Sequence, residues 1–170
     1  EFSKTSGLYL SNASGEVSSS TLRDNRAASG YAGLEVSAGG SVGIRNNTFQ
    51  RNSIGLSIGG SSNQTTAVSD NSFLDNDQSA IQFSGGRVSF SGNSASGNGL
   101  DGILTVPSLL GGVTLEPDLP YVFDTNTTTT VSSGTSLVIS PGVILKFKGA
   151  AVLYIDGALD AQGTVALPIA

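Results

Sequence analysis

The sequence predicts an all-β solenoid, in which successive turns of the chain stack their strands in parallel. Three observations lead to this fold class. The motif Asn47-Thr48-Phe49-Gln50-Arg51-Asn52 recurs as Asn71-Ser72-Phe73-Leu74-Asp75-Asn76. Apolar residues fall in columns at a constant offset from that motif, and short runs repeat the order small, apolar, variable, apolar. Such repeats favour a solenoid, because one unit cannot bury its apolar face without a neighbour.

The repeat has a wide turn, whose length is typical of solenoids. Its second Asn recurs as Asn25, Asn52, Asn76 and Asn98, at intervals of 52 − 25 = 27, 76 − 52 = 24 and 98 − 76 = 22. Two apolar columns keep the same register and are predicted to form the core: Leu22, Phe49, Phe73 and Ala95 in one, and Val17, Ile44, Val68 and Phe90 in the other. Each repeat should therefore be one rung of the solenoid.

Each rung is predicted to contain short strands joined by tight corners. The pattern Gly33-Leu34-Glu35-Val36 returns at 7–10, 55–58, 80–83 and 102–105, and its period of two places one face inward and one outward. Glycine pairs follow at Gly39-Gly40, Gly59-Gly60 and Gly85-Gly86, where a sharp corner favours residues that tolerate positive φ. No window keeps apolar residues at helical spacing, so helices are not expected.

The recurring Asn residues are predicted to form a structural ladder. Stacked rungs place equivalent residues about 4.8 Å apart, which is within reach of side-chain amide hydrogen bonds. Asn also tolerates the left-handed conformation of a corner. We therefore expect Asn25, Asn52, Asn76 and Asn98 to hold the corners together.

Three segments are expected along the chain. Residues 1–105 carry the wide rungs, 106–120 form a connector with Pro107, Pro117 and Pro120, and 121–170 form a second, tighter strand-rich block. The tighter spacing rests on Leu137 and Ile139, which recur as Leu153 and Ile155. The second block is predicted to adjoin or cap the first solenoid. The first and last residues suggest a mature or excised piece.

Composition excludes several classes of function. The chain has 170 residues, no Cys and no His, which rules out Ser-His-Asp, Cys-His and zinc-hydrolase mechanisms. A net charge of -5 with 8 Lys and Arg argues against nucleic acid or an anionic membrane as partner. No apolar run approaches the roughly 18 residues of a membrane span, so no membrane insertion is expected.

The motifs resemble those of a known superfamily. Turns of the type Gly-small-Asn-x-Phe-x-x-Asn, followed by Gly-Ile/Leu-x-Ile/Val strands, resemble the right-handed parallel β-helix repeat of the pectin-lyase-like superfamily. Residues 119–122, 137–147 and 153–164 resemble the module that opens a β-helix in large secreted bacterial proteins, in which the array continues beyond the point where Ala170 stands. The resemblance implies a β-helix and an extracellular or cell-surface location. It leaves function open, because this scaffold hosts lyases, hydrolases, adhesins and structural stalks.

A polysaccharide lyase is the first enzymatic hypothesis. Resemblance to pectate-type lyases implies a carboxylate cluster for calcium and an Arg or Lys base on one outward face. The column Asp24, Arg51 and Asp75 places acid, base and acid on successive rungs, with Asp77 and Arg23 nearby. The same column also fits a surface ion-pair ladder of alternating charge, worth about 0–1 kcal/mol per pair. Calcium is expected only under the lyase hypothesis, and otherwise we predict no metal and no cofactor.

Glycoside hydrolysis and glycan binding are two further hypotheses. A hydrolase needs two carboxylates about 5–9.5 Å apart in a groove, which a pair among Asp70, Asp75, Asp77 and Asp101 could supply. The predicted outward column of Tyr9, Glu35, Ser57, Gln82 and Leu104 is polar with one aromatic ring, which favours weak rather than strong sugar binding. A flat Thr grid for ice binding is not supported, because Thr127 to Thr130 lie on one turn.

The sequence thus favours a non-catalytic structural or adhesive β-helix segment of a secreted or cell-surface protein. Its partners would be surface glycans, or further copies of the chain stacked end to end, because a solenoid end exposes unpaired strand edges. The competing hypothesis is a lyase or hydrolase that uses carboxylates around Asp75.

Overall fold

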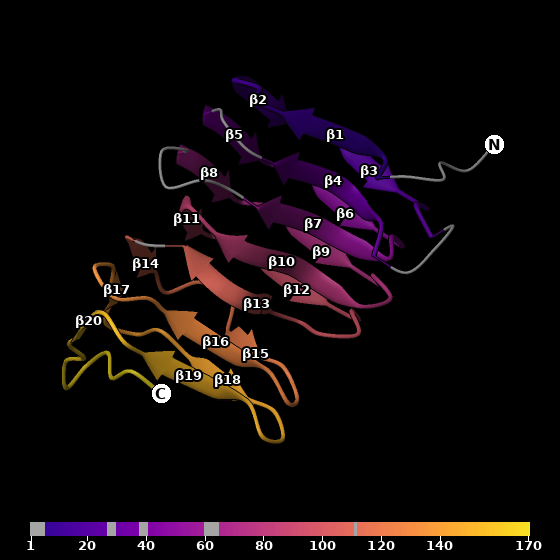
Figure 1. Cartoon of the computed structure of the whole chain (residues 1–170). Helices are drawn as coiled ribbons and strands as arrows, with labels where there is room; N and C mark the ends of the chain where they lie inside the picture. The colour runs from indigo at the N-terminus through magenta and orange to yellow at the C-terminus, as the bar shows by residue number, and fades with distance from the viewer. Residues whose placement is uncertain (1–5, 27–29, 38–40, 60–64, 111) are drawn as a thin grey trace.

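The computed structural model describes residues 6–26, 30–37, 41–59, 65–110 and 112–170. Its strands run in parallel and stack turn upon turn from the N-terminal to the C-terminal end (Figure 1). No helix in these ranges is long and apolar enough to cross a membrane. The all-β solenoid predicted from the repeats is therefore confirmed.

Three parallel sheets form the walls of the first turns. Sheet A contains β1 (Leu8–Ser11), β4 (Ala32–Ser37), β7 (Ile54–Gly59), β10 (Ser79–Gly85), β13 (Ile103–Leu110), β15 (Tyr121–Phe123) and β18 (Leu145–Phe147). Sheet B contains β2 (Gly15–Ser18), β5 (Ser41–Arg45), β8 (Thr65–Ser69) and β11 (Arg87–Ser91). Sheet C contains β3 (Thr21–Arg23), β6 (Thr48–Gln50), β9 (Ser72–Leu74) and β12 (Ser94–Ser96).

The C-terminal turns have three strands each, like the first turns, but in a different arrangement. Strands β14 (Val113–Leu115), β17 (Ser136–Ile139) and β20 (Ala158–Ala161) form one sheet, and β16 (Thr128–Val131) and β19 (Val152–Ile155) continue from the second half of β13. Sheet C ends with β12. The step from Ile103 to its partner Tyr121 is shorter than the preceding step, from Ile81 to Ile103.

The strand register aligns the two apolar columns that the repeats indicated. In sheet C, Phe49 lies between Leu22 and Phe73, and Ala95 follows. In sheet B, Ile44 lies between Val17 and Val68, and Phe90 follows. The middle members are fully buried, whereas Val17 and Leu22 of the first turn are partly buried. The alternation of inward and outward residues follows from the two-residue period of a strand.

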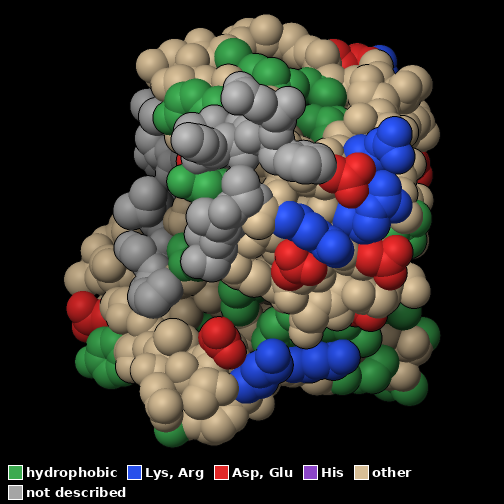
Figure 2. Space-filling model, turned by 90° about the vertical axis from the view of Figure 1, so that its right-hand side faces the viewer, with side chains coloured by type: hydrophobic (Ala, Val, Ile, Leu, Met, Phe, Trp, Pro, Cys, Tyr) green, Lys and Arg blue, Asp and Glu red, His purple; other side chains and the backbone are tan. Residues whose placement is uncertain are grey.

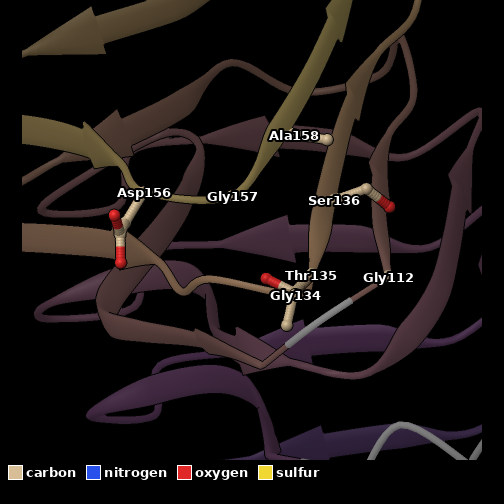
Figure 3. A pocket seen from close by; sticks show the side chains of 7 residues that line it. All are labelled: Gly112, Gly134, Thr135, Ser136, Asp156, Gly157 and Ala158. Carbon is tan, nitrogen blue, oxygen red and sulfur yellow. The ribbon is translucent and has the colours of Figure 1, made fainter.

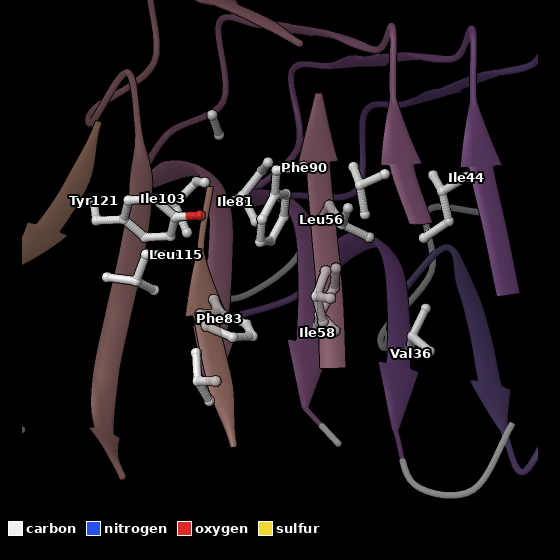
Figure 4. Packing of buried hydrophobic residues seen from close by; sticks show 14 of the residues in the cluster. Val36, Ile44, Leu56, Ile58, Ile81, Phe83, Phe90, Ile103, Leu115 and Tyr121 are labelled. Carbon is white, nitrogen blue, oxygen red and sulfur yellow. The ribbon is translucent and has the colours of Figure 1, made fainter. Parts of the chain in front are cut away.

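Aromatic rings fill the interior between the sheets. The Phe49 and Phe73 rings stack in parallel with centroids 5.0 Å apart, because successive rungs repeat the same residue at the same position. The Phe83 and Phe90 rings meet edge to face at 5.7 Å, and aliphatic side chains of neighbouring turns surround them (Figure 4). Such contacts add to the transfer free energy of the buried rings.

The predicted glycine corners are described in part. Gly85 and Gly86 have φ of 110° and 98°, a backbone region that residues other than glycine rarely adopt. Gly59 ends β7. Gly39, Gly40 and Gly60 lie outside the described residues.

The alignment of Leu137 with Leu153, on which the tighter spacing of the C-terminal block rested, is wrong. Leu137 pairs with Leu159, and Leu153 pairs with Thr129, so the steps are 159 − 137 = 22 and 153 − 129 = 24. These steps are like those of the first turns. Leu-x-Ile recurs on β17 and β19 of neighbouring walls, because any inward-facing strand favours alternating apolar residues.

The interval 106–120, predicted as a connector, also carries strand pairing. It contains the second half of β13 and all of β14, and residues 121–123 rejoin sheet A beside β13. Tyr121 anchors the bend that precedes it. Its buried hydroxyl accepts a hydrogen bond from the Glu116 N–H and donates one to the Glu116 carbonyl, both at 3.2 Å.

Candidate functional site

The column Asp24, Arg51 and Asp75 lies at the corner where the chain leaves sheet C. Each residue has a left-handed backbone, with φ of 65°, 52° and 53°, and Gly97 continues the column with φ of 72°. Their N–H groups donate to carbonyls one turn ahead, from Asp24 to Gln50, from Arg51 to Leu74 and from Asp75 to Ser96. The left-handed conformation suits Asp and Gly and is uncommon for Arg.

Arg51 and Asp24 form a bidentate ion pair. Nε of Arg51 donates to Oδ1 of Asp24 at 2.7 Å, and Nη2 donates to Oδ2 at 3.1 Å. Arg23 adds a weaker contact, with Nε 3.7 Å from Oδ2 of Asp24. Two parallel charge-assisted bonds favour the ionised forms of both partners.

The pKa values follow from this geometry. The hydrogen bond from Arg51 lowers the pKa of the Asp24 carboxyl, with the charge of Arg51 adding to the effect. The same bond raises the pKa of the Arg51 guanidinium. Asp24 is therefore a carboxylate at neutral pH and Arg51 a cation. A general base must lose its proton, which the paired Arg51 does not do.

Arg26 ties the remaining candidates together across two turns. Its Nη2 donates to the Asp75 carbonyl at 2.6 Å and lies 3.1 Å from Oδ1 of Asp77. Basic and acidic side chains thus gather on one face of the molecule (Figure 2). Of the three residues in the predicted column, Asp24 and Arg51 form an ion pair. Arg26 pairs with the Asp77 side chain, and it contacts Asp75 through the main-chain carbonyl.

Two grooves on the described surface lie away from this column. One of about 840 Å³ is lined by Gly112, Gly134, Thr135, Ser136, Asp156, Gly157 and Ala158, and Asp156 is the one carboxylate among these described residues (Figure 3). Another of about 540 Å³ is lined by Asp101, Lys146 and Lys148 with apolar neighbours. Asp24, Arg51, Asp75 and Asp77 line neither of these two. A hydrolase pair needs two carboxylates facing one bound sugar, which neither groove offers.

Within the described residues, no three His, Cys, Asp or Glu side chains are grouped so that they could hold a metal ion. Burial raises the pKa of Tyr121 well above its usual range, but its hydroxyl is occupied by the Glu116 main chain. A perturbed pKa of this kind reflects structure rather than an exposed acid or base.

The predicted Asn ladder forms at the same corner. Nδ2 of Asn25, Asn52 and Asn76 each donates to Oδ1 of the next Asn, at 2.8, 3.2 and 2.7 Å. The backbone N–H groups of the same residues donate to the same oxygens. Each of these Oδ1 atoms therefore accepts two bonds, and the amide's second N–H reaches a carbonyl of the preceding turn, as Asn76 does with Phe49. These bonds satisfy buried polar groups that would otherwise destabilise the corner.

A second ladder, at the corner between sheets B and C, was missed. It joins Asn47, Asn71 and Asn93 by Nδ2 to Oδ1 bonds of 3.1 and 3.0 Å. Asn47 and Asn71 are buried. The signal was present, because these residues stand five positions before Asn52, Asn76 and Asn98 in every one of these copies of the motif.

Both ladders end on a carboxylate. Asn98 donates its N–H and its Nδ2 to Oδ1 of Asp101, at 2.9 and 2.7 Å. Asn93 donates the equivalent pair to Oδ1 and Oδ2 of Asp118, at 3.0 and 2.7 Å. Asp101 was a candidate of the hydrolase hypothesis, and in the structure its Oδ1 belongs to the ladder.

Comparison with known proteins agrees with this architecture. A family model described as a right handed beta helix region matches residues 1–116, which is well over half of the chain. The chain belongs to the right-handed β-helix family. No curated protein and no solved structure matches this β-helix. The family assignment therefore fixes the fold, while the role depends on the geometry of its surface.

Proposed function

We propose that this β-helix is a non-catalytic structural or adhesive segment of a secreted or cell-surface protein. The bidentate ion pair between Arg51 and Asp24 is the main support for this proposal. In the column Asp24, Arg51 and Asp75, which most resembles an acid-base site, the ion pair joins two successive turns of the solenoid. A catalytic carboxylate or base would instead face a substrate groove with a free lone pair.

The interior of the β-helix supports a structural role as a stiff rod. Two ladders of Asn side chains run through successive turns, and stacked Phe rings lie beside one of them. These turns are thereby bonded to one another by side chains as well as by main-chain pairing. Stacked repeats that contact only their neighbours behave as a rod whose stiffness comes from these contacts.

The outward face of sheet A supports weak adhesion to glycans. A groove of about 180 Å³ runs across β4, β7 and β10 and is lined by Glu35, Ser37, Ser57, Gln82 and Ser84 with apolar neighbours. Hydroxyl, amide and carboxylate groups can exchange hydrogen bonds with sugar hydroxyls. The small volume and the polar lining favour a short, low-affinity contact rather than a deep site.

A screen for cleavage tests the non-catalytic role. The purified chain is incubated with polyuronates and neutral glycans, with and without calcium, and new reducing ends and unsaturated products are measured. We expect neither. Cleavage that Asp75→Ala abolishes would overturn the proposal in favour of a lyase or hydrolase.

Asn46→Ala is the matched control for that screen, because Asn46 belongs to none of the proposed sites. Asn46 has the same left-handed backbone as Asp75, with φ of 54° against 53°. Its corner adjoins the second ladder, away from the Arg cluster. If both substitutions reduced an activity equally, backbone strain and not the Asp75 carboxylate would be the cause.

A further inference from the structure

The sequence contains one Asn-Gly pair, Asn98-Gly99, and it lies at the corner where the first ladder meets its carboxylate. In such a pair, the main-chain nitrogen of the glycine can attack the side-chain amide carbon of the asparagine. Glycine favours this attack, because it has no Cβ to obstruct the approach and its backbone is permissive. Every other Asn of the sequence is followed by a residue with a side chain. By sequence alone, Asn98 is therefore the Asn most prone to lose its side-chain amide.

The fold requires both members of this pair. Asn98 continues the ladder, because its Oδ1 accepts hydrogen bonds from the N–H and the Nδ2 of Asn76, at 3.0 and 2.7 Å. At Gly99, an added Cβ would overlap the Asp77 carbonyl and lie 2.7 Å from the Gln78 carbonyl oxygen of the preceding turn. A larger residue at position 99 would thus displace the main chain. The corner keeps a reactive pair because neither residue can be exchanged without loss.

The folded corner restrains the groups that would react. Nδ2 of Asn98, which is the leaving group, donates to Oδ1 of Asp101 at 2.7 Å and to the Phe73 carbonyl at 2.9 Å. The attacking nitrogen of Gly99 donates its hydrogen to the Asn76 carbonyl at 2.9 Å. The reaction expels Nδ2 and removes the glycine hydrogen, so all three of these bonds must break first. The structure therefore protects a bond that is reactive in an unfolded chain.

This protection depends on an exposed residue. Asp101 is exposed, and its Oδ1 accepts both the N–H and the Nδ2 of Asn98. Asn52 and Asn76 of the same ladder are buried, whereas Asn98 is half-buried. Opening a few exposed hydrogen bonds requires less free energy than opening a buried core. We therefore expect this ladder to open first at Asn98.

We propose that Asn98 is a modification site, which is protected while the corner is closed and deamidates to aspartate or isoaspartate when the corner opens. The Gly99 nitrogen gives its proton to solvent and bonds to Cγ of Asn98. The bond from Cγ to Nδ2 breaks, and Nδ2 takes up a proton and leaves as ammonia. Water then opens the cyclic imide at either of its carbonyls. The net change is uptake of water and release of ammonia, and the proposal is independent of the non-catalytic role.

The modified residue no longer fits the ladder. Aspartate at position 98 would place a carboxylate oxygen where Nδ2 of Asn98 lies, 2.7 Å from Oδ1 of Asp101 and 2.9 Å from the Phe73 carbonyl oxygen. Acceptors would then face one another without a donor, which destabilises a partly buried site. Isoaspartate would in addition lengthen the main chain at the corner. Deamidation would therefore leave a lasting mark on a chain whose corner has opened.

Mass spectrometry of the incubated protein tests the proposal. The chain is held at mildly alkaline pH, which speeds removal of the Gly99 proton, either folded or unfolded in guanidinium chloride. Conversion of each amide to an acid is then located by peptide fragmentation, with Asn93 as the internal control. We expect Asn98 to convert at least about tenfold faster in the unfolded chain than in the folded one. Equal rates in the two states, or conversion of Asn93 as fast as that of Asn98, would overturn the proposal.

Two variants test whether the end of the ladder provides the protection. Asp101→Ala removes an acceptor of Asn98 and should speed its conversion in the folded chain about tenfold. Asp118→Ala is the matched control, because Asp118 accepts the equivalent pair of bonds from Asn93 in the second ladder. It should leave the rate at Asn98 unchanged, and circular dichroism verifies that both variants are folded. No acceleration by Asp101→Ala, or equal acceleration by both variants, would contradict protection by this corner.

Asn98→Asp reproduces the aspartate product and tests whether the mark is lasting. It should unfold at a lower urea concentration than the wild type, because the ladder loses the two donors of Nδ2. Asn126→Asp is the matched control, since Asn126 is also at a corner, is exposed and belongs to neither ladder. It should unfold like the wild type. Equal midpoints for Asn98→Asp and the wild type would show that the product still fits the corner, against the proposal.

Discussion

Asp118 receives the last two hydrogen bonds of a ladder that begins nearer the opposite end of the β-helix, because Asn93 donates both its N–H and its Nδ2 to this carboxylate. An interior rung needs an acceptor and two amide donors, whereas the last rung needs an acceptor alone. This difference accounts for Asn at the interior positions and Asp at the ends. We therefore expect Asp to Asn to be tolerated at the end of a ladder, and Asn to Asp to be destabilising inside it.

At the end of the ladder, Asp118→Asn should be tolerated. The amide oxygen of Asn can still accept from Asn93. Asp118→Ala should lower the free energy of unfolding by about 1–3 kcal/mol, because the Asn93 donors lose their partner. Urea denaturation of the two variants beside the wild type measures this. Equal losses for Asn and Ala would show that the negative charge itself is required.

Inside the ladder, the reverse exchange should be harmful. Asn76 is buried and donates to Asn98 and to the Phe49 carbonyl. Asn76→Asp removes both donors and sets a carboxylate against two oxygens, so we expect a loss of at least about 2 kcal/mol in the free energy of unfolding. The denaturation midpoint checks it. A variant as stable as the wild type would mean that the ladder is not maintained in solution.

The stacked rings should contribute most of all. Phe73 is fully buried against Phe49, and Phe73→Ala should lower the free energy of unfolding by about 3–5 kcal/mol. Phe73→Leu, which keeps most of the volume, should cost less. Thermal and urea unfolding distinguish the two. Similar, small losses for both would contradict the tight packing of this column.

The ion pair at the corner should make stability depend on pH. The pKa of Asp24 is lowered in the folded state, chiefly by the hydrogen bond from Arg51, so Asp24 binds its proton more readily in the unfolded chain. The pair stabilises the fold above the unfolded value of about 3.9, and this contribution is lost as the pH falls through the lowered pKa. The melting temperatures of wild type and Asp24→Asn should therefore differ at neutral pH and converge in acid. A difference that stays constant would assign the effect to the backbone instead.

The repeats predicted the interior better than the surface. Phe49 and Phe73 could be placed because identical residues at a fixed period must stack when strands do. The carboxylates at the ends of the ladders could not be predicted, because they lie outside the repeat. Asp101 is three residues from Asn98, and Asp118 is twenty-five residues from Asn93. Sequence also could not choose between Asp24 and Asp75 as partner of Arg51. Both are one rung away, and the direction of the Arg side chain decides.

The C-terminal turns show a related limit. Strands on different walls of one turn carry the same apolar alternation, so Leu153 was aligned with Leu137 when it pairs with Thr129. Register there is set by corner geometry, which composition does not encode. The first turns avoided this error because the Asn-x-Phe motif marks one corner in successive copies.

A double-mutant cycle on Asp24 and Arg51 tests most directly the claim that the charged corner of this β-helix is an internal ion pair and not a reactive site. The melting temperatures of wild type, Asp24→Asn, Arg51→Gln and the double variant are measured at neutral pH and low salt. The ion pair predicts that each single change lowers the melting temperature and that the double change lowers it by no more than the larger single effect. Strictly additive effects would contradict it.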